Sequence, residues 1–120
     1  MEGSTSLTLV GWSLGGVYAR ELARREPRHV RQVITLGSPF APTDPPIAVP
    51  STSVYSRLDG VVSWAACLEP ETSRHQNVEV RCSHLGFGVD PATLWLIADR
   101  LAGPPGQHRP FSPLPLLRPA

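Results

Sequence analysis

The spacing of apolar residues changes near the start of the chain. Residues 6–10 (SLTLV) form a short run rich in β-forming side chains, and Gly11 ends it, which predicts a buried strand. Beyond this glycine, apolar residues recur at helical spacing with arginine and glutamate between them: Leu14, Val17, Tyr18 and Leu22. The pattern predicts an amphipathic helix that ends near Pro27.

Three further strands and a second long helix follow from the same reasoning. Short runs rich in β-formers predict strands at 30–36, 51–58 and 77–82, and a short helical piece is expected at 61–67. Asp90 suits a helix N-cap and Pro91 its first turn, ahead of an apolar face formed by Leu94, Ile97, Ala98 and Leu101. Alternation of nearly continuous apolar strands with helices predicts an α/β fold with a mostly parallel sheet.

The positions of the prolines divide the chain into a folding part and a tail. The length of 120 residues suits one domain. Of the 14 prolines, five fall within 39–50 and six within 104–119. The sequence therefore predicts a domain over 1–103, interrupted by a proline-rich loop, and a proline-rich tail over 104–120.

The charges point to no polyanionic partner. The formal net charge is +1, so neither nucleic acid nor an anionic membrane is called for as a partner. Glutamates interleave with the arginines near the first helix, which favours a solvated helix face for Arg20, Arg24, Arg25, Arg28 and Arg31. No apolar run is long enough for a transmembrane helix, and residues 1–4 lack the features of a signal peptide, so a cytoplasmic location is expected.

The two cysteines show no metal-binding or redox spacing. Cys67 and Cys82 form no Cys-x-x-Cys motif, and a disulfide between them stays open at this point. The sequence implies no metal and no cofactor.

A serine flanked by glycines follows the first predicted strand, in Gly11-Trp12-Ser13-Leu14-Gly15. A sharp strand-to-helix turn exposes a serine hydroxyl, and neighbours without Cβ atoms allow the backbone to close tightly. The position predicts a nucleophile elbow, and the alternative is an ordinary glycine-rich turn.

A serine nucleophile requires a histidine base and a carboxylate that orients it. Asp59 follows the third predicted strand and His84 follows the fourth, so both are expected at the carboxyl edge of the sheet, beside Ser13. The other aspartates fall in the proline-rich loop, at the helix N-cap and on a solvent-facing helix position: Asp44, Asp90 and Asp99. The other histidines are expected on the surface: His29, His75 and His108. The alternative for Asp59 is an Asp-Gly turn.

Residues 7–103 resemble the carboxyl-terminal half of an α/β-hydrolase of the lipase or esterase type. The resemblance rests on LTLVGWSLGG, VITLGSPF, STSVYSRLDGVVSW and VEVRCSHLGFGVDP, and on the chain order Ser, Asp, His. It implies hydrolysis of a small acyl ester through an acyl-serine intermediate, with the catalytic residues Ser13, Asp59 and His84 and with the Leu14 N–H as an oxyanion donor. The same scaffold also hosts acyltransferases, thioesterases and inactive relatives.

Two departures from these relatives shape the expectation. Only six residues precede Leu7, so the strands and the second oxyanion donor that relatives carry before the elbow are expected to be missing. The segment 38–50 is short and proline-rich, which predicts an open site. An inactive remnant or interaction module is therefore the rival hypothesis, with self-association or a partner chain at the exposed sheet edge. Trp12 is expected either to line an acyl pocket or to fill the core.

Overall fold

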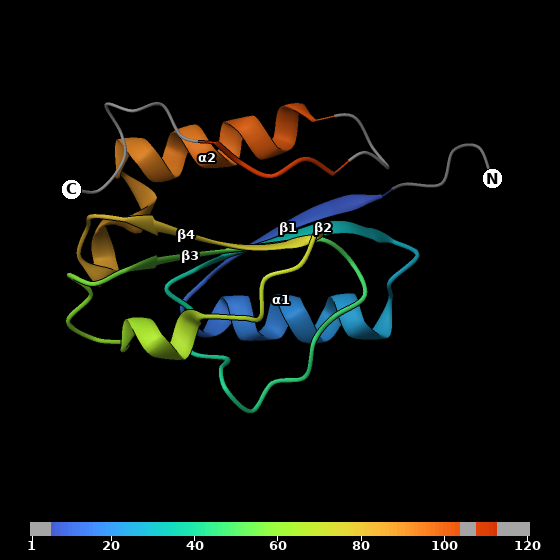
Figure 1. Ribbon diagram of the computed structural model, residues 1–120, viewed down its shortest axis with the longest axis horizontal. Coiled ribbons are helices and arrows are strands. Elements are labelled where there is room, and N and C mark those ends of the chain that lie inside the picture. The colour runs from blue at the N-terminus through green and yellow to red at the C-terminus, as the bar shows by residue number, and fades with distance from the viewer. Residues whose placement is uncertain (1–5, 104–107, 113–120) are drawn as a thin grey trace.

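The computed structural model describes residues 6–103 and 108–112, whose centre is a parallel sheet (Figure 1). Its four strands lie in the order β1-β2-β3-β4, and every neighbouring pair is parallel. Their bounds are β1 Leu7–Trp12, β2 Val30–Leu36, β3 Ser51–Ser56 and β4 His75–Val80. The predicted α/β fold with a mostly parallel sheet is confirmed.

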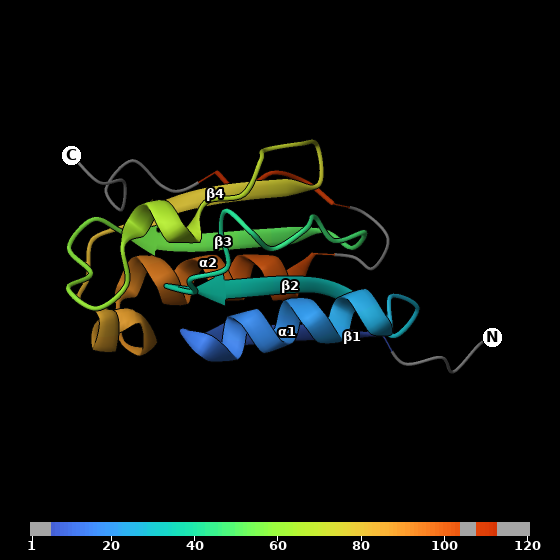
Figure 2. The same ribbon diagram turned by 90° about the horizontal axis from the view of Figure 1, so that it is seen from below.

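Helices cover both faces of this sheet. Helix α1 (Leu14–Arg25) lies on one face and α2 (Pro91–Ala102) on the other, as the two perpendicular views show (Figures 1 and 2). Two short 3-10 helices, η1 (Trp64–Cys67) and η2 (His84–Gly88), belong to the connections that follow β3 and β4. Because the strands are parallel, the segments that follow them gather at one edge of the sheet.

Three strands differ from their predicted bounds. The first was expected at 6–10 with Gly11 ending it, but β1 runs from Leu7 through Gly11 to Trp12. β3 ends at Ser56 and β4 begins at His75 and ends at Val80, and the two pair in register from Ser51↔His75 to Ser56↔Val80. The Ser56 hydroxyl donates to the carbonyl of Cys82 and accepts from its N–H, so the chain leaves the backbone ladder there. The helical piece expected at 61–67 is shortened to η1, and η2 was not predicted.

The apolar faces predicted for the two long helices are mostly not the buried faces, although Ile97 of α2 packs against the core. Leu14, Tyr18 and Leu22 are 54%, 66% and 48% exposed. Instead, the buried residues of α1 are Gly16, Arg20 and Ala23. In α2 the buried residues are Thr93, Leu96 and Arg100. Small side chains let α1 approach the strands closely, which decides the buried face against the larger apolar residues. The Asp90 N-cap is confirmed, because its carboxylate accepts from the Thr93 N–H at 2.9 Å.

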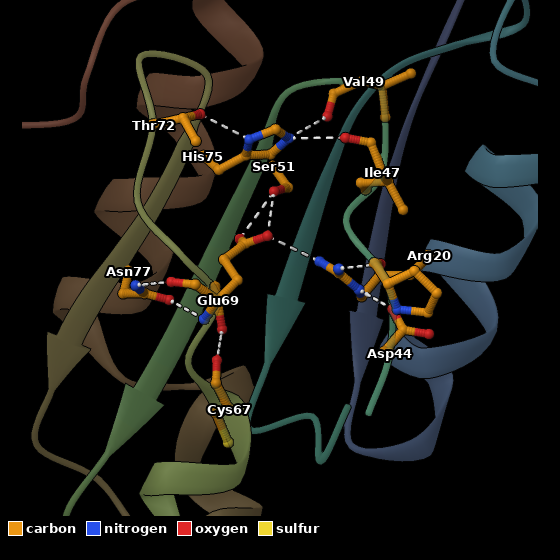
Figure 3. A network of polar contacts seen from close by, with 12 residues as sticks. Arg20, Asp44, Ile47, Val49, Ser51, Cys67, Glu69, Thr72, His75 and Asn77 are labelled. Atoms are coloured by element: carbon orange, nitrogen blue, oxygen red, sulfur yellow. Dashed lines mark hydrogen bonds and ion pairs between the residues drawn. The ribbon is translucent and has the colours of Figure 1, made fainter. Parts of the chain in front are cut away.

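Arg20 lies inside the molecule, contrary to the expectation of a solvated helix face. Its side chain is 1% exposed and pairs with Asp44 at 2.7 Å and with Glu69 at 2.9 Å (Figure 3). Glu69 also accepts from the Ser51 hydroxyl, and the Arg20 guanidinium lies over the Phe40 ring. This network ties α1 to the proline-rich loop and to β3.

Apolar side chains form a core on each face of the sheet. On the α2 side the buried cluster contains Ile34, Leu36, Val54, Val78, Val80, Phe87, Leu96 and Phe111. On the α1 side it contains Ala23, Val30, Val33, Ile47 and Val49. The two clusters fix the sheet between its helices and so fix the edge where the strands end.

Part of the predicted tail packs on the domain. Phe111 is buried, and its backbone exchanges two hydrogen bonds with the Gln76 side chain. The remainder of the predicted tail, residues 104–107 and 113–120, lies outside the described residues, as do residues 1–5. Cys67 and Cys82 are free thiols, and burial raises the pKa of each to about 11.

Candidate active site

Ser13 occupies a strained turn between β1 and α1. Its backbone has φ 55° and ψ −126°, and within the described residues it is the one non-glycine residue at positive φ. Its N–H donates to the Leu36 carbonyl at 2.8 Å, which ties the turn to the end of β2. A backbone of this kind costs about 1–3 kcal/mol and persists only where the surrounding structure holds it, as in a nucleophile elbow.

The turn depends on two glycines, of which the sequence interpretation recognised one. A Cβ on Gly11 would meet the Gly15 carbonyl oxygen at 2.5 Å, as the motif predicts. A Cβ on Gly15 would meet nothing within 4 Å, so the structure does not require glycine there. The close approach is at Gly16 instead, where a Cβ would lie 1.9 Å from the Ser38 Oγ and 2.7 Å from its Cβ. Gly16 therefore brings α1 against the end of β2.

The structure brings Ser13, His84 and Asp59 into one chain of hydrogen bonds. The Ser13 Oγ lies 2.9 Å from the His84 Nε2, and the His84 Nδ1 lies 2.8 Å from the Asp59 Oδ2. An ionised carboxylate only accepts, so the proton belongs on Nδ1 of His84. In neutral His84, Nε2 is then the acceptor for the Ser13 hydroxyl. The residues come from three separate connections at the carboxyl edge of the sheet.

Asp59 is buried and held by the chain around it. Its side chain is 1% exposed, and Oδ1 accepts the N–H groups of Val61 and Val62, each at 2.9 Å. Burial alone would raise the pKa of Asp59. The hydrogen bonds from Val62, His84 and Val61 outweigh burial, so the pKa lies below the usual value of 3.8. Asp59 is thus kept ionised beside the imidazole.

Two aromatic side chains hold His84 in place. The Trp12 Nε1–H donates to the His84 carbonyl at 2.8 Å, and the two rings lie 5.2 Å apart. The Phe87 ring meets the imidazole edge-on, with ring centroids 6.4 Å apart and an interplanar angle of 88°. Trp12 is 45% exposed, so it does not fill the core as one of the two expectations held.

Ser56 is a positioning contact that sequence reasoning missed. It stands at the end of β3, three residues before Asp59, and its hydroxyl bonds both the N–H and the carbonyl of Cys82, two residues before His84. It also accepts the Leu58 N–H at 3.1 Å. One side chain thus links the connection that carries the carboxylate to the one that carries the imidazole. A serine at a strand end has no distinctive pattern that could have revealed this.

The remaining histidines and aspartates lie away from this chain of hydrogen bonds. His29 is exposed, as expected. His75 is half-buried at the start of β4 rather than in a loop, and its Nε2 lies 2.9 Å from the Ile47 carbonyl oxygen while its Nδ1 lies 2.7 Å from the Thr72 hydroxyl (Figure 3). Asp44 pairs with Arg20 and Arg24, and Asp99 pairs with Arg100. Among the described residues no group of three His, Cys, Asp or Glu side chains is arranged to hold a metal ion.

The Leu14 N–H begins α1 directly after Ser13. The first N–H groups of a helix have no partner within the helix, and the helix dipole adds partial positive charge at this end. A negatively charged oxygen on a carbon atom bonded to the Ser13 Oγ would therefore meet a favourable field. The segment 38–50 passes on the α1 side of the sheet (Figure 2).

A parallel sheet covered by helices on both faces, with a strained serine where a strand meets a helix, defines an α/β protein of the hydrolase type. Comparison with family models gives the same result, since the model of the alpha/beta hydrolase fold matches residues 3–77, more than half of the chain. The chain belongs to the α/β-hydrolase fold family. A search of curated proteins found no match. The matched range includes Ser13 and Asp59, and His84 lies beyond it.

Proposed function

We propose that this protein is a serine hydrolase that cleaves carboxylic esters through an acyl-serine intermediate. The observation that supports the proposal best is the hydrogen-bonded chain from the Ser13 Oγ through His84 to the buried Asp59 carboxylate. Serine is a weak nucleophile unless an adjacent base takes its proton, and this arrangement provides the base and its orienting carboxylate.

The proposed reaction has two proton transfers in each half. His84 Nε2 takes the Ser13 hydroxyl proton while Oγ bonds to the ester carbonyl carbon, and the carbonyl oxygen becomes an oxyanion beside the Leu14 N–H. The protonated imidazole then donates to the leaving alcohol oxygen as its bond to carbon breaks, which leaves an acyl-serine. Water repeats the sequence, its proton passing through His84 back to Ser13, and the carboxylic acid is released.

The hydrogen bond between the Asp59 carboxylate and the His84 Nδ1 supports the assignment of His84 as the base. The carboxylate holds the proton on Nδ1 and stabilises the positive charge that the imidazole gains when it accepts the serine proton. The lowered pKa of Asp59 keeps this side chain ionised during the reaction. An acyltransferase or thioesterase would use the same three groups with another acceptor or leaving group.

Covalent labelling with a fluorophosphonate tests the proposal. The wild-type chain should be labelled at Ser13, as located by peptide mass spectrometry, and hydrolyse p-nitrophenyl butyrate. Ser13→Ala should lose the label and keep its far-UV circular dichroism spectrum. Ser73→Ala, at the opposite edge of the sheet, is the matched control and should be labelled like the wild type.

Labelling should also be slower in acidic than in neutral buffer, because a protonated imidazole cannot accept the hydroxyl proton. A folded wild-type chain that takes no label would contradict the proposal and favour the inactive relative. Labelling without hydrolysis, together with acyl transfer to an added alcohol or thiol, would favour an acyltransferase instead.

A further inference from the structure

A cavity lies at the edge of the sheet opposite Ser13. Its volume is about 550 Å³, and its walls include Val30 at the start of β2, Pro50 before β3 and Arg74 before β4. Ser13, Asp59 and His84 follow strands, whereas this cavity opens where strands begin. It is therefore separate from the proposed catalytic residues.

The lining of this cavity is strongly basic. Four arginines contribute to it: Arg31, Arg74, Arg100 and Arg109. Among the described residues that line it Asp99 is the single carboxylate, and His108 is the one histidine. Burial, followed by the positive charges of Arg100 and Arg74, lowers the pKa of His108.

Two of the guanidinium groups are held in position by the protein. Arg100 is 8% exposed and bonds the Asp99 carboxylate and the Arg109 carbonyl. Arg31 donates to the Gly103 carbonyl at 2.6 Å through Nη2. The Gln32 amide donates to the Arg100 carbonyl at 3.0 Å, which fixes the end of α2 against β2. Holding these groups in advance lowers the entropy cost of binding a ligand between them.

Arg100 is the one arginine of the four that pairs with a carboxylate in the described part of the chain, since Arg31 bonds a carbonyl instead. Arg74 and Arg109 lie on exposed segments and have no ion pair with a carboxylate among the residues that the structure describes. With one carboxylate against four guanidinium groups, the cavity has an excess of positive charge. A ligand with more than one negative charge matches this excess better than a simple carboxylate does.

We propose that this cavity binds a small molecule through a phosphoryl group. A phosphate monoester carries about −1.5 to −2 charges at neutral pH and three acceptor oxygens. The planar guanidinium fork matches phosphate oxygens in pairs. The apolar residues Val30 and Val49 line the same cavity and offer contacts for the organic part of the molecule. The proposal is independent of the hydrolase activity.

Thermal unfolding in increasing inorganic phosphate tests this site, with sodium chloride at equal ionic strength as the reference. Phosphate that binds the folded state should raise the melting temperature in proportion to the logarithm of its concentration once the site fills. Pyrophosphate, with more charge, should raise it further. Equal shifts in chloride and in phosphate would overturn the proposal.

Arg74→Gln with Arg109→Gln is the decisive variant, because both side chains lie on exposed segments and their loss should leave the fold intact. It should weaken phosphate binding about tenfold or more, since one charge-assisted hydrogen bond is worth about that factor. Arg25→Gln removes an exposed arginine from α1 and should bind phosphate like the wild type. An unchanged phosphate affinity in the double variant would refute the site.

Flotation with vesicles distinguishes a lipid headgroup from a free phosphate ester. Binding to phosphatidic acid vesicles, absent for phosphatidylcholine and lost in the double variant, would identify a lipid source. A phosphate-dependent melting shift without flotation would identify a free phosphorylated molecule.

Discussion

Trp12 contacts His84 in two ways, through its indole N–H and through its ring. The hydrogen bond ends on the backbone of His84, so it sets where the whole residue stands relative to the neighbouring Ser13. A side chain in this place acts on the reaction through the imidazole. We therefore expect Trp12 to be a positioning residue.

Trp12→Phe keeps an aromatic ring and removes the N–H. We expect kcat for ester hydrolysis to fall about twofold to tenfold, the value of one hydrogen bond, with little change in KM. The dependence of kcat on pH should also change in this variant. Trp95→Phe is the control, because Trp95 is also 45% exposed and lies on α2. A change in KM alone would mean that Trp12 contacts the substrate instead.

Asp59 should make the stability of the protein depend on acid. Its pKa is 3.8 in an unconstrained chain and lower in the folded protein. A lowered folded pKa contributes stability that is complete above the unfolded value and is lost as the pH falls through the folded value. The free energy of unfolding should therefore decline as the pH drops below about 4.

Urea unfolding of wild type and Asp59→Asn across acidic pH measures this contribution. The two curves should converge as the pH falls, because the amide cannot gain or lose the proton. Asp90→Asn keeps a good helix N-cap and should follow the wild type. Parallel curves for wild type and Asp59→Asn would contradict the prediction.

At the scale of elements, α1 is attached to the sheet by a buried ion pair network as well as by small residues. Arg20 is enclosed by Asp44, Glu69 and the Phe40 ring. Charges removed from water need partners, and a partner left alone in the interior is strongly unfavourable. The helix thus depends on a loop that is distant in sequence.

Arg20→Ala should lower the free energy of unfolding by about 3–5 kcal/mol, because Glu69 would stay buried without its partner. Arg25→Ala removes a 74% exposed arginine that pairs with Glu21 on the same helix, and should cost about 0–1 kcal/mol. Urea midpoints of the two variants give the comparison. Similar losses would show that burial of Arg20 contributes nothing.

At the scale of the whole molecule, apolar side chains are exposed along one side. β1 stands at the end of the strand order, and in the described residues no strand pairs with its outer edge. Leu7 and Val10 on β1 are exposed, as are Tyr18 and Leu22 on α1. An unpaired apolar edge favours association with another chain. Separately, none of the helices in the described part of the chain is long and apolar enough to cross a membrane.

We expect this 120-residue chain to elute earlier from a size-exclusion column as its concentration rises. Leu22→Glu should shift elution towards the monomer, since a charge on this surface opposes apolar contact. Leu94→Glu is the matched control, because Leu94 is 49% exposed against 48% for Leu22 but lies on α2. A wild-type chain that stays monomeric at every concentration would contradict this expectation.

Local patterns were enough to predict the order of the four strands and the two long helices, and the residues at the carboxyl edge. The β2 strand, the Asp90 cap and the parallel sheet follow from side-chain propensities and from the alternation of strands and helices. Sequence order also brought Ser13, Asp59 and His84 to one edge, where the structure links them by hydrogen bonds. Their catalytic role stays a prediction.

Which side chains are buried was decided only by the tertiary structure. A helical pattern marks an apolar face, but which face meets the sheet depends on how closely the backbones approach, so Gly16 and Ala23 lie inside while Leu22 is exposed. Arg20 could be buried because Asp44 and Glu69 reach it from later segments. The hydrogen bond from the Trp12 indole N–H to the His84 carbonyl joins residues 72 positions apart. The sequence determined roughly where the strands and the two long helices form, because those preferences are local. Strand ends, packing and pairing depend on partners that only the fold brings together.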